Sequence, residues 1–250
     1  MGLAFTVDSP IKVARFGISS VLSLAEDRLI EMMRKHYSQL AEEKYHPIGP
    51  NMVDYRAKRI TAYLNLVNRI VQKQFNTLQQ EAFGKGNEID QYFEMLPTDS
   101  ALRKSYEDLF QTDCPTKRSL LERELRSKMQ PGSIDVNIMT KLDKSNPSPT
   151  GEILDENSDA VAALRGYAQS NLSQSSIVFS AGMNPRLFNY LDQFEDFHTF
   201  KKKVIVKVTD FRSALIQGKY LAKKGIWVSE FRIESGLNCG GHAFATDGYL

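Results

Sequence analysis

The chain has 250 residues, of which 42% are hydrophobic and 25% charged, and its formal net charge is +2. These values are ordinary for a soluble globular protein, and no basic tail suggests a nucleic-acid partner. No apolar stretch approaches the roughly 20 residues that span a bilayer, and no basic leader begins the chain. We therefore expect a soluble, cytoplasmic protein without a membrane or nucleic-acid partner.

The first residues alternate between strand and helix patterns. We expect a strand at residues 3–7, a short helix at 11–16 closed by Gly17, a second strand at 18–23, and a helix that ends near Tyr37. Such short links between strands and helices are typical of parallel α/β architecture.

Residues 39–131 show hardly any strand signal. Apolar residues between 59 and 83 recur at helical spacing, Ser100 is a plausible helix cap, and another helix is expected to start near Thr116. We interpret residues 39–131 as a helical insertion between a first part, residues 1–38, and a last part, residues 132–250. A separate domain with its own function is the alternative.

The α/β alternation returns at Ser133. Strands are expected at residues 134–139, 176–182, 203–208 and 226–233, and helices at 159–171, 184–194 and 210–224, the last one ended by Gly225. The predicted fold class is α/β, a (β/α)₈ barrel of the TIM type with about six of its eight strands present. We expect the sequence to stop before the last two strands.

The loop after the last predicted strand carries the richest candidate site. Ligands of parallel α/β folds bind at the carboxyl ends of the strands. The loop reads Glu-Ser-Gly-Leu-Asn-Cys-Gly-Gly-His over residues 234–242. Glycines such as Gly240 and Gly241 let a ligand approach the backbone closely, and His242 can exchange protons near neutral pH. A surface turn with an incidental histidine is the alternative.

The order of these motifs resembles that of the nitronate monooxygenase (2-nitropropane dioxygenase-like) family of flavin mononucleotide (FMN) barrels. The matching features are the Ser9-Pro10 turn, the Val136-Asn137 pair, a strand ending in Gly182, the helix end from Ala222 to Gly225, and Glu234 leading to Gly240-Gly241-His242. The likeness covers about residues 3–38 and 133–242. The loop after Glu234 is longer than in the family, and Val7-Asp8-Ser9 stands where the family shows Ala-Pro-Met.

The resemblance implies an FMN-dependent oxidoreductase. His242 would act beside the flavin as a base or would orient an anionic substrate, while Gly240 and Gly241 would lie against the cofactor. Asn137 would bind the flavin edge, and Gly182 and Lys207 complete the predicted cofactor contacts. The substrate would be a nitronate or a similar carbanion, with oxygen as electron acceptor. Because the family binds the phosphate after strands seven and eight, we expect this chain alone to bind flavin poorly.

Several alternatives stay open. The chain could be an enoyl-thioester reductase fed by NAD(P)H, or an aldolase-like barrel that uses Lys207 and Glu234. It could also be non-catalytic, with a partner docking on aromatic residues of the insertion: Tyr63, Phe75, Phe83, Tyr92 and Phe93. A homo-oligomer is possible, and no residue cluster has metal-ligand spacing. Glu230, Arg232 and Glu234 either form a charged network inside a barrel or face the helices.

Overall fold

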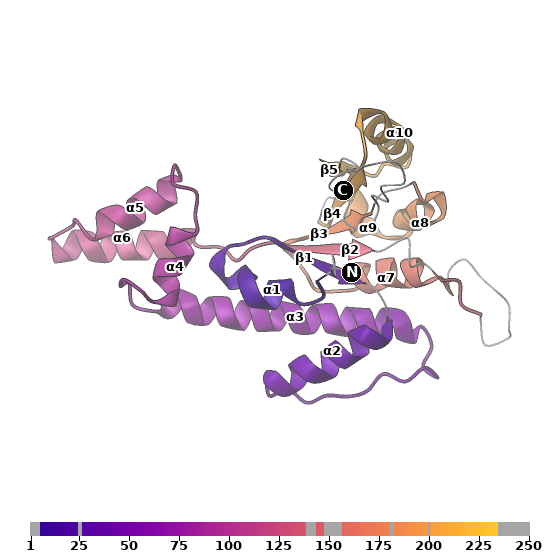
Figure 1. Ribbon diagram of the computed structural model, residues 1–250, viewed down its shortest axis with the longest axis horizontal. Helices are drawn as coiled ribbons and strands as arrows, with labels where there is room; N and C mark the ends of the chain where they lie inside the picture. The colour runs from indigo at the N-terminus through magenta and orange to yellow at the C-terminus, as the bar shows by residue number, and fades with distance from the viewer. Residues whose placement is uncertain are drawn as a thin grey trace, which may run out of the picture. The chain divides into compact units, whose positions relative to one another are not determined.

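The computed structural model describes residues 6–24, 27–138, 144–147, 157–180, 183–199 and 201–234 (Figure 1). The chain forms two compact units. The sheet unit comprises Met1–Val7, Val21–Leu66 and Asp135–Leu250, and the helical unit comprises Asp8–Ser20 and Val67–Ile134. The boundaries expected from the sequence, at residues 38 and 131, stay predictions.

A five-stranded parallel sheet organises the sheet unit. Its strands are β1 (Ser20–Leu24), β2 (Ile134–Ile138), β3 (Ser175–Phe179), β4 (Lys203–Val208) and β5 (Val228–Ile233), and their order in space is their order in the sequence. Parallel crossovers are right-handed almost without exception. A sequential order therefore places the connecting helices on one face of the sheet and leaves the other face for different partners.

The predicted α/β class is confirmed, whereas a closed barrel is not seen. Among the described residues, β1 and β5 are the two edges of the sheet. The sixth strand expected at residues 3–7 lies largely outside the described residues. Its described end runs beside β1, because the Ser23 amide donates to the Thr6 carbonyl over 2.8 Å and the Thr6 hydroxyl donates to the Val21 carbonyl.

Three of the helices that follow strands begin at a side-chain cap. They are α7 (Asp159–Ala168) after β2, α8 (Pro185–Tyr190) after β3 and α10 (Phe211–Ala222) after β4. Ser158, Asn184 and Asp210 accept hydrogen bonds from the amides of Val161, Leu187 and Ser213 over 3.2, 3.0 and 2.7 Å. Capping side chains satisfy amides that have no partner within the helix, so these residues fix where each helix starts at the carboxyl edge of the sheet.

The other helices agree with the predicted pattern to within a few residues, except α4 and α9, which were not predicted. They are α1 (Ser9–Val13), η1 (Ala14–Phe16), α2 (Asp27–Leu40), α3 (Tyr55–Gln80), α4 (Glu88–Glu94), α5 (Ala101–Leu109), α6 (Pro115–Lys128), η4 (Leu191–Gln193) and α9 (Glu195–His198). His198 ends the single turn of α9. Gly17 and Gly225 adopt the left-handed conformation that closes the preceding helices. No helix in the described ranges has both the length and the apolar character needed to cross a membrane.

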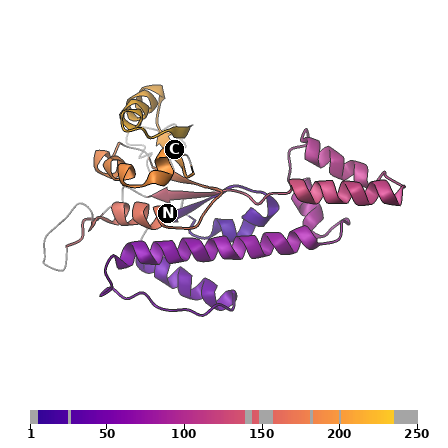
Figure 2. The same cartoon turned by 180° about the vertical axis from the view of Figure 1, so that it is seen from behind.

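The helical unit has an aromatic core of its own. Its buried members include Phe75, Phe83, Tyr92 and Phe93, which the docking interpretation placed on a surface. Helices α5 and α6 lie side by side in both views (Figures 1 and 2), and α5 brings Tyr106 into that core. The rings of Phe93 and Tyr106 stack with centroids 4.3 Å apart. These aromatic residues therefore pack the interior of the helical unit.

Large apolar side chains remain exposed at the β5 edge of the sheet. Phe211 on α10 is 75% exposed, and Trp227 and Ile233 at β5 are each 65% exposed. Helix α10 packs on β4 and β5, where the ring of Phe231 lies against Gly218. The neighbouring edge thus carries apolar surface that the described residues do not cover.

Helix α3 approaches α7 closely at Gly166. A Cβ atom placed on Gly166 would lie 2.7 Å from Ile60 and 2.9 Å from the Ala57 carbonyl oxygen. The hydroxyl of Thr61 donates to the Gly166 carbonyl over 3.0 Å and fixes this contact. The two backbones can approach this closely only because the position carries no side chain.

We predict that Gly166→Ala destabilises the sheet unit by about 1–3 kcal/mol, because the added methyl group overpacks the contact with α3. Alanine is the better helix former by up to about 1 kcal/mol, so helix propensity alone would stabilise the variant. A loss of stability would therefore come from the steric contact with α3. Urea unfolding monitored by circular dichroism measures the change. Gly49→Ala is the control, since a Cβ there meets nothing within 4 Å. Equal stability of both variants would contradict the close approach.

Candidate functional site

One face of the sheet carries most of the polar side chains of the strands, together with the buried apolar residues Val178 and Ile205, and we call it the polar face. Along β2, Ile134, Val136 and Ile138 alternate with Asp135 and Asn137, and all five residues are buried. The face shared by Asp135 and Asn137 continues through Ser176 on β3, Lys203 and Lys207 on β4, and Glu230 and Arg232 on β5, which the strand register sets side by side. Because the connecting helices take the other face, this polar face is the one left for a ligand.

Asp135 is the centre of a hydrogen-bond network on the polar face. Its side chain is only 9% exposed. One carboxylate oxygen accepts from the Ser176 hydroxyl over 2.5 Å, and the other accepts from Arg232 Nη2 over 2.6 Å. Arg232 Nε donates to Glu230 Oε1 over 2.5 Å. The buried carboxylate therefore has a partner for each of its oxygens, as a buried charge requires.

The network also fixes the charge state of its outer members. The hydrogen bond between Arg232 and Glu230 raises the pKa of Arg232, and the bond to Asp135 adds to the same effect. The same hydrogen bond from Arg232 lowers the pKa of Glu230. Both residues are thus held in their charged forms. The predicted alternation of Glu230, Arg232 and Glu234 forms a charged network on the polar face, and the alternative that these residues face the helices is wrong.

The pair of Arg232 and Asp135 shows that the sheet curves toward its polar face. Strands β2 and β5 are separated by β3 and β4. In a flat sheet, three strand spacings amount to about 14 Å. Side chains that rise from the sheet close such a distance only when the sheet bends, and here the two charged groups lie 2.6 Å apart.

Asn137 presents an unused hydrogen-bond acceptor near the carboxyl edge of β2. The residue is 7% exposed, and its Nδ2 donates to the Ser23 hydroxyl over 3.3 Å. Its Oδ1 is buried and has no hydrogen-bond partner within the described part of the chain. A buried polar atom without a partner is costly, so this oxygen is suited to receive a donor from a ligand.

Lys207 lies on β4 at the same edge, where it pairs with a carboxylate. Its Nζ is 2.5 Å from Glu234 Oε1, and the two side chains are 24% and 31% exposed. The pair places one cation and one anion at the rim of the polar face.

The remaining predicted site residues lie outside the described residues. They are Gly182, Gly240, Gly241 and His242. The strand that leads to them is described as far as Glu234, whose amide donates to the Val208 carbonyl over 2.8 Å. The structure therefore brings Asn137 and Lys207 to one face, and the roles of the glycines and His242 stay predictions.

Sequence reasoning missed Asp135 and Ser176 as members of this site. The alternation Ile-Asp-Val-Asn-Ile over residues 134–138 was the available signal, since it puts Asp135 on the same side of β2 as Asn137. Ser176 gave no comparable signal, because its role depends on the neighbour that the register supplies.

A pocket of about 750 Å³ opens elsewhere in the sheet unit. It is lined by Pro50, Asn51, Met52, Val53, Asp54, Tyr55, Arg56, Pro147, Asn157, Ala162, Arg165, Tyr190 and Gln193. Its size suits a small ligand. Both of its arginines are already paired, however: Arg165 binds both carboxylate oxygens of Asp54, and Arg56 Nε lies 3.1 Å from Asp159. The charges of this pocket thus serve the fold.

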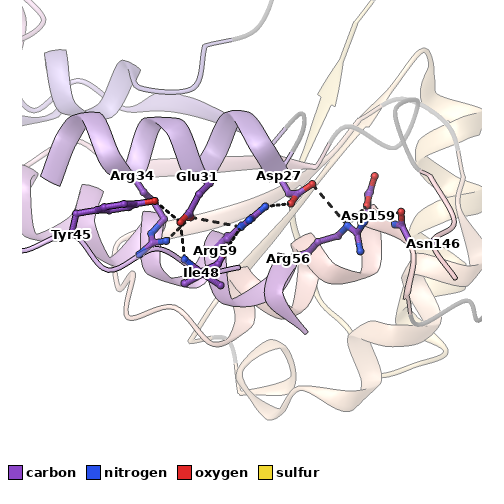
Figure 3. A network of polar contacts seen from close by, with 9 residues as sticks. All are labelled: Asp27, Glu31, Arg34, Tyr45, Ile48, Arg56, Arg59, Asn146 and Asp159. Atoms are coloured by element: carbon purple, nitrogen blue, oxygen red, sulfur yellow. Dashed lines mark hydrogen bonds and ion pairs between the residues drawn. The ribbon is translucent and has the colours of Figure 1, made fainter. Parts of the chain in front are cut away.

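The arginines of α3 belong to a polar network that joins α2 to the starts of α3 and α7 (Figure 3). Arg59 donates to Asp27 over 2.6 Å, and Arg56 donates to Asn146 over 3.0 Å. The Glu31 carboxylate accepts from the Tyr45 hydroxyl over 2.7 Å and from the Ile48 amide over 2.9 Å. The network holds the chain that follows β2 against the helices.

Glu31 also bonds to Arg34 in this network. Burial alone would raise the pKa of Glu31, but the hydrogen bonds from Ile48, Tyr45 and Arg34 outweigh it and hold the pKa below its usual value. The carboxylate is therefore ionised and contributes to stability at neutral pH.

Lys202 is a buried amine with a structural role. It is 5% exposed, and its Nζ donates to the carbonyls of Tyr167, Ala168 and Ser170 over 2.6, 2.8 and 2.8 Å. Burial lowers its pKa to about 8. All three acceptors lie at the end of α7, where a cation stabilises unpaired carbonyls. The amine is thus engaged and is not a candidate nucleophile.

No group of histidine, cysteine and acidic residues in the described ranges is arranged to hold a metal ion. Cys114, which precedes α6, is a free and exposed thiol. No protein-family model matches the sequence, and neither a curated protein nor a solved structure matches it significantly. The polar face of the sheet is therefore the candidate functional site.

We predict that Glu31→Gln lowers the free energy of unfolding at neutral pH by about 1–3 kcal/mol, because its charged hydrogen bonds are lost. The folded pKa of Glu31 is lowered, so its stabilisation is present above the unfolded pKa and disappears as the pH falls through the folded value. The difference in free energy of unfolding between the unaltered chain and Glu31→Gln should therefore become smaller as the pH falls from neutral to about 3.

Urea unfolding across that pH range measures the difference. Glu42→Gln is the control, since Glu42 is an exposed carboxylate just after α2. A difference that stays constant with pH would contradict the assignment of an ionised, stabilising Glu31.

Proposed function

We propose that the chain is part of a flavin-binding (β/α)₈ barrel and acts as an FMN-dependent oxidoreductase of the nitronate monooxygenase type. The observation that carries the proposal is the buried, unpartnered Oδ1 of Asn137 on the polar face. The sequential order of parallel strands, the curvature toward that face and the resemblance of the motifs support it.

The residues present fit the pyrimidine edge of a flavin. That edge carries an N–H donor between two carbonyl oxygens, and Asn137 Oδ1 is an acceptor that lacks a donor. Ser23 holds the Asn137 amide from the other side, so the acceptor is oriented before a ligand arrives. A hydrogen bond to this oxygen would remove the penalty of leaving it unpaired.

Lys207 would supply positive charge at the same edge. The ring system of a reduced flavin gains negative charge, and a nearby ammonium stabilises it. In the structure this ammonium is balanced by Glu234, at 2.5 Å. Binding of an electron-rich ring edge would give Lys207 a second partner beside Glu234.

FMN, if bound there, would supply the electron acceptor that oxidises the substrate and is reoxidised by oxygen. His242 would take a proton from the substrate or orient its anionic group, with Gly240 and Gly241 keeping that loop close to the cofactor. A nitronate or a similar carbanion suits this arrangement, because its charge is spread over atoms that a protonated imidazole can bind.

We predict that FMN binds weakly to the chain and that Asn137→Ala weakens binding by roughly three- to tenfold, the effect of one lost hydrogen bond. Quenching of FMN fluorescence as protein is added measures both affinities. Asn76→Ala is the control, because Asn76 is exposed on α3. A chain that leaves FMN fluorescence unchanged at the highest protein concentration would overturn the proposal.

We predict that His242→Ala keeps the FMN affinity of the unaltered chain and lowers nitronate turnover by about 10²-fold or more, since general acid–base groups contribute that much. Oxygen consumption by the FMN-loaded protein measures turnover. His46→Ala serves as the control because His46 is exposed. Undiminished turnover in His242→Ala would remove the histidine from the mechanism, and oxygen-independent turnover with NAD(P)H would favour an enoyl-thioester reductase.

A further inference from the structure

The ion pair of Arg232 and Asp135 connects the two sides of the proposed flavin site. We propose that Arg232 is a positioning residue: its bond to Asp135 sets the width of that site. The width in question is the spacing between Asn137 on β2 and Lys207 on β4, the two described side chains that would bind the cofactor. The inference rests on the proposed function, because it assigns a role within the same site.

The strand register places both ends of the pair directly beside the binding groups. Arg232 is the register partner of Lys207, so its backbone lies next to that residue in the sheet. Asp135 precedes Asn137 by two residues and shares its face of β2. A single 2.6 Å contact therefore ties the strand beside Lys207 to the strand that carries Asn137.

The pair is held firmly enough to act as a tether. Asp135 is fixed from its other side by the Ser176 hydroxyl, and Arg232 is fixed by Glu230. The side chain of Asp135 is 9% exposed, so loss of its cation would leave a buried charge without compensation. Loss of the bond would also remove the one described side-chain contact between Arg232 and β2.

Arg232 acts through the sheet and not on the ligand. Its Nη2 bonds Asp135 and its Nε bonds Glu230, so the guanidinium already has carboxylate partners on two sides. Asp135 comes two residues before Asn137 in β2, whereas Arg232 lies level with Lys207 at the neighbouring strand, so the bond crosses the sheet beneath the position of Asn137. Its effect on a cofactor would be geometric.

The test compares Arg232→Met, Arg232→Lys and the matched control Arg212→Met, an exposed arginine of α10. The measurements are FMN affinity by fluorescence quenching and the visible circular dichroism of bound FMN, which reports how the ring is held. Far-ultraviolet circular dichroism shows whether each variant is folded. We expect Arg232→Met to weaken FMN binding by about tenfold or more and to change the visible band. Arg232→Lys keeps the charge and should therefore restore part of the FMN affinity and part of the visible band. Arg212→Met should equal the unaltered chain in both measurements.

A double variant, Arg232→Met with Asp135→Asn, shows whether the two side chains affect FMN binding through their bond or independently of each other. If the two side chains act only through their bond, the double variant binds FMN no more weakly than Arg232→Met alone. Additive losses would overturn the inference, and so would unchanged affinity and an unchanged visible band in Arg232→Met. If Arg232→Met does not fold, the FMN affinity and visible band of Arg232→Lys and Asp135→Asn show whether the bond between Arg232 and Asp135 affects FMN binding. If the unaltered chain binds FMN and the Arg232 variants bind it equally well, only the positioning role of Arg232 is refuted. If the unaltered chain does not bind FMN, the proposed function is refuted as well.

Discussion

Polar side chains buried on one face of a parallel sheet need partners, and this requirement shapes the sheet unit. Asp135 meets it with Ser176 and Arg232, and the reach to Arg232 bends the sheet across two intervening strands. Asn137 lies two residues further along β2 and has only part of the partners it needs. Its Nδ2 bonds to Ser23, whereas its Oδ1 has no hydrogen-bond partner among the described residues. The same constraint thus accounts for the curvature and for the position of the candidate site.

The sequence predicted local structure well, because local structure follows from spacing and capping. The strand at 203–208 and the helices opened by Asn184 and Asp210 were visible as patterns of apolar residues and caps. The bond between Arg232 and Asp135 was not visible, since it joins residues that only the curvature of the sheet brings together. The face of the sheet on which Glu230 and Arg232 lie likewise could not be predicted without the strand register, because a shift of β5 by one residue would place both side chains on the opposite face.

The aromatic residues of the helical unit show a second limit of sequence reasoning. A stripe of apolar side chains along a helix has the same spacing whether it binds a partner or packs a core. Phe83, Phe93 and Tyr106 pack against one another around the buried carboxylate of Asp90, which accepts from Tyr106 over 2.7 Å. Burial of Asp90 would raise its pKa, but hydrogen bonds from Gly86, Tyr106 and Lys85 outweigh it and keep the pKa low. Only the packing distinguishes an interior from a surface here.

The interleaving of the two units has a consequence for how the chain reaches its folded state. Strands β1 and β2 are neighbours in the sheet, although β1 ends at Leu24 and β2 begins at Ile134. Their pairing closes a long loop, and its entropic penalty falls if the helices between them have already collapsed into their own core. Strands β3, β4 and β5 are joined by much shorter segments and can pair early. Assembly of the sheet should therefore proceed from β5 toward β2, with β1 added last, at a rate governed by the helices that precede β2.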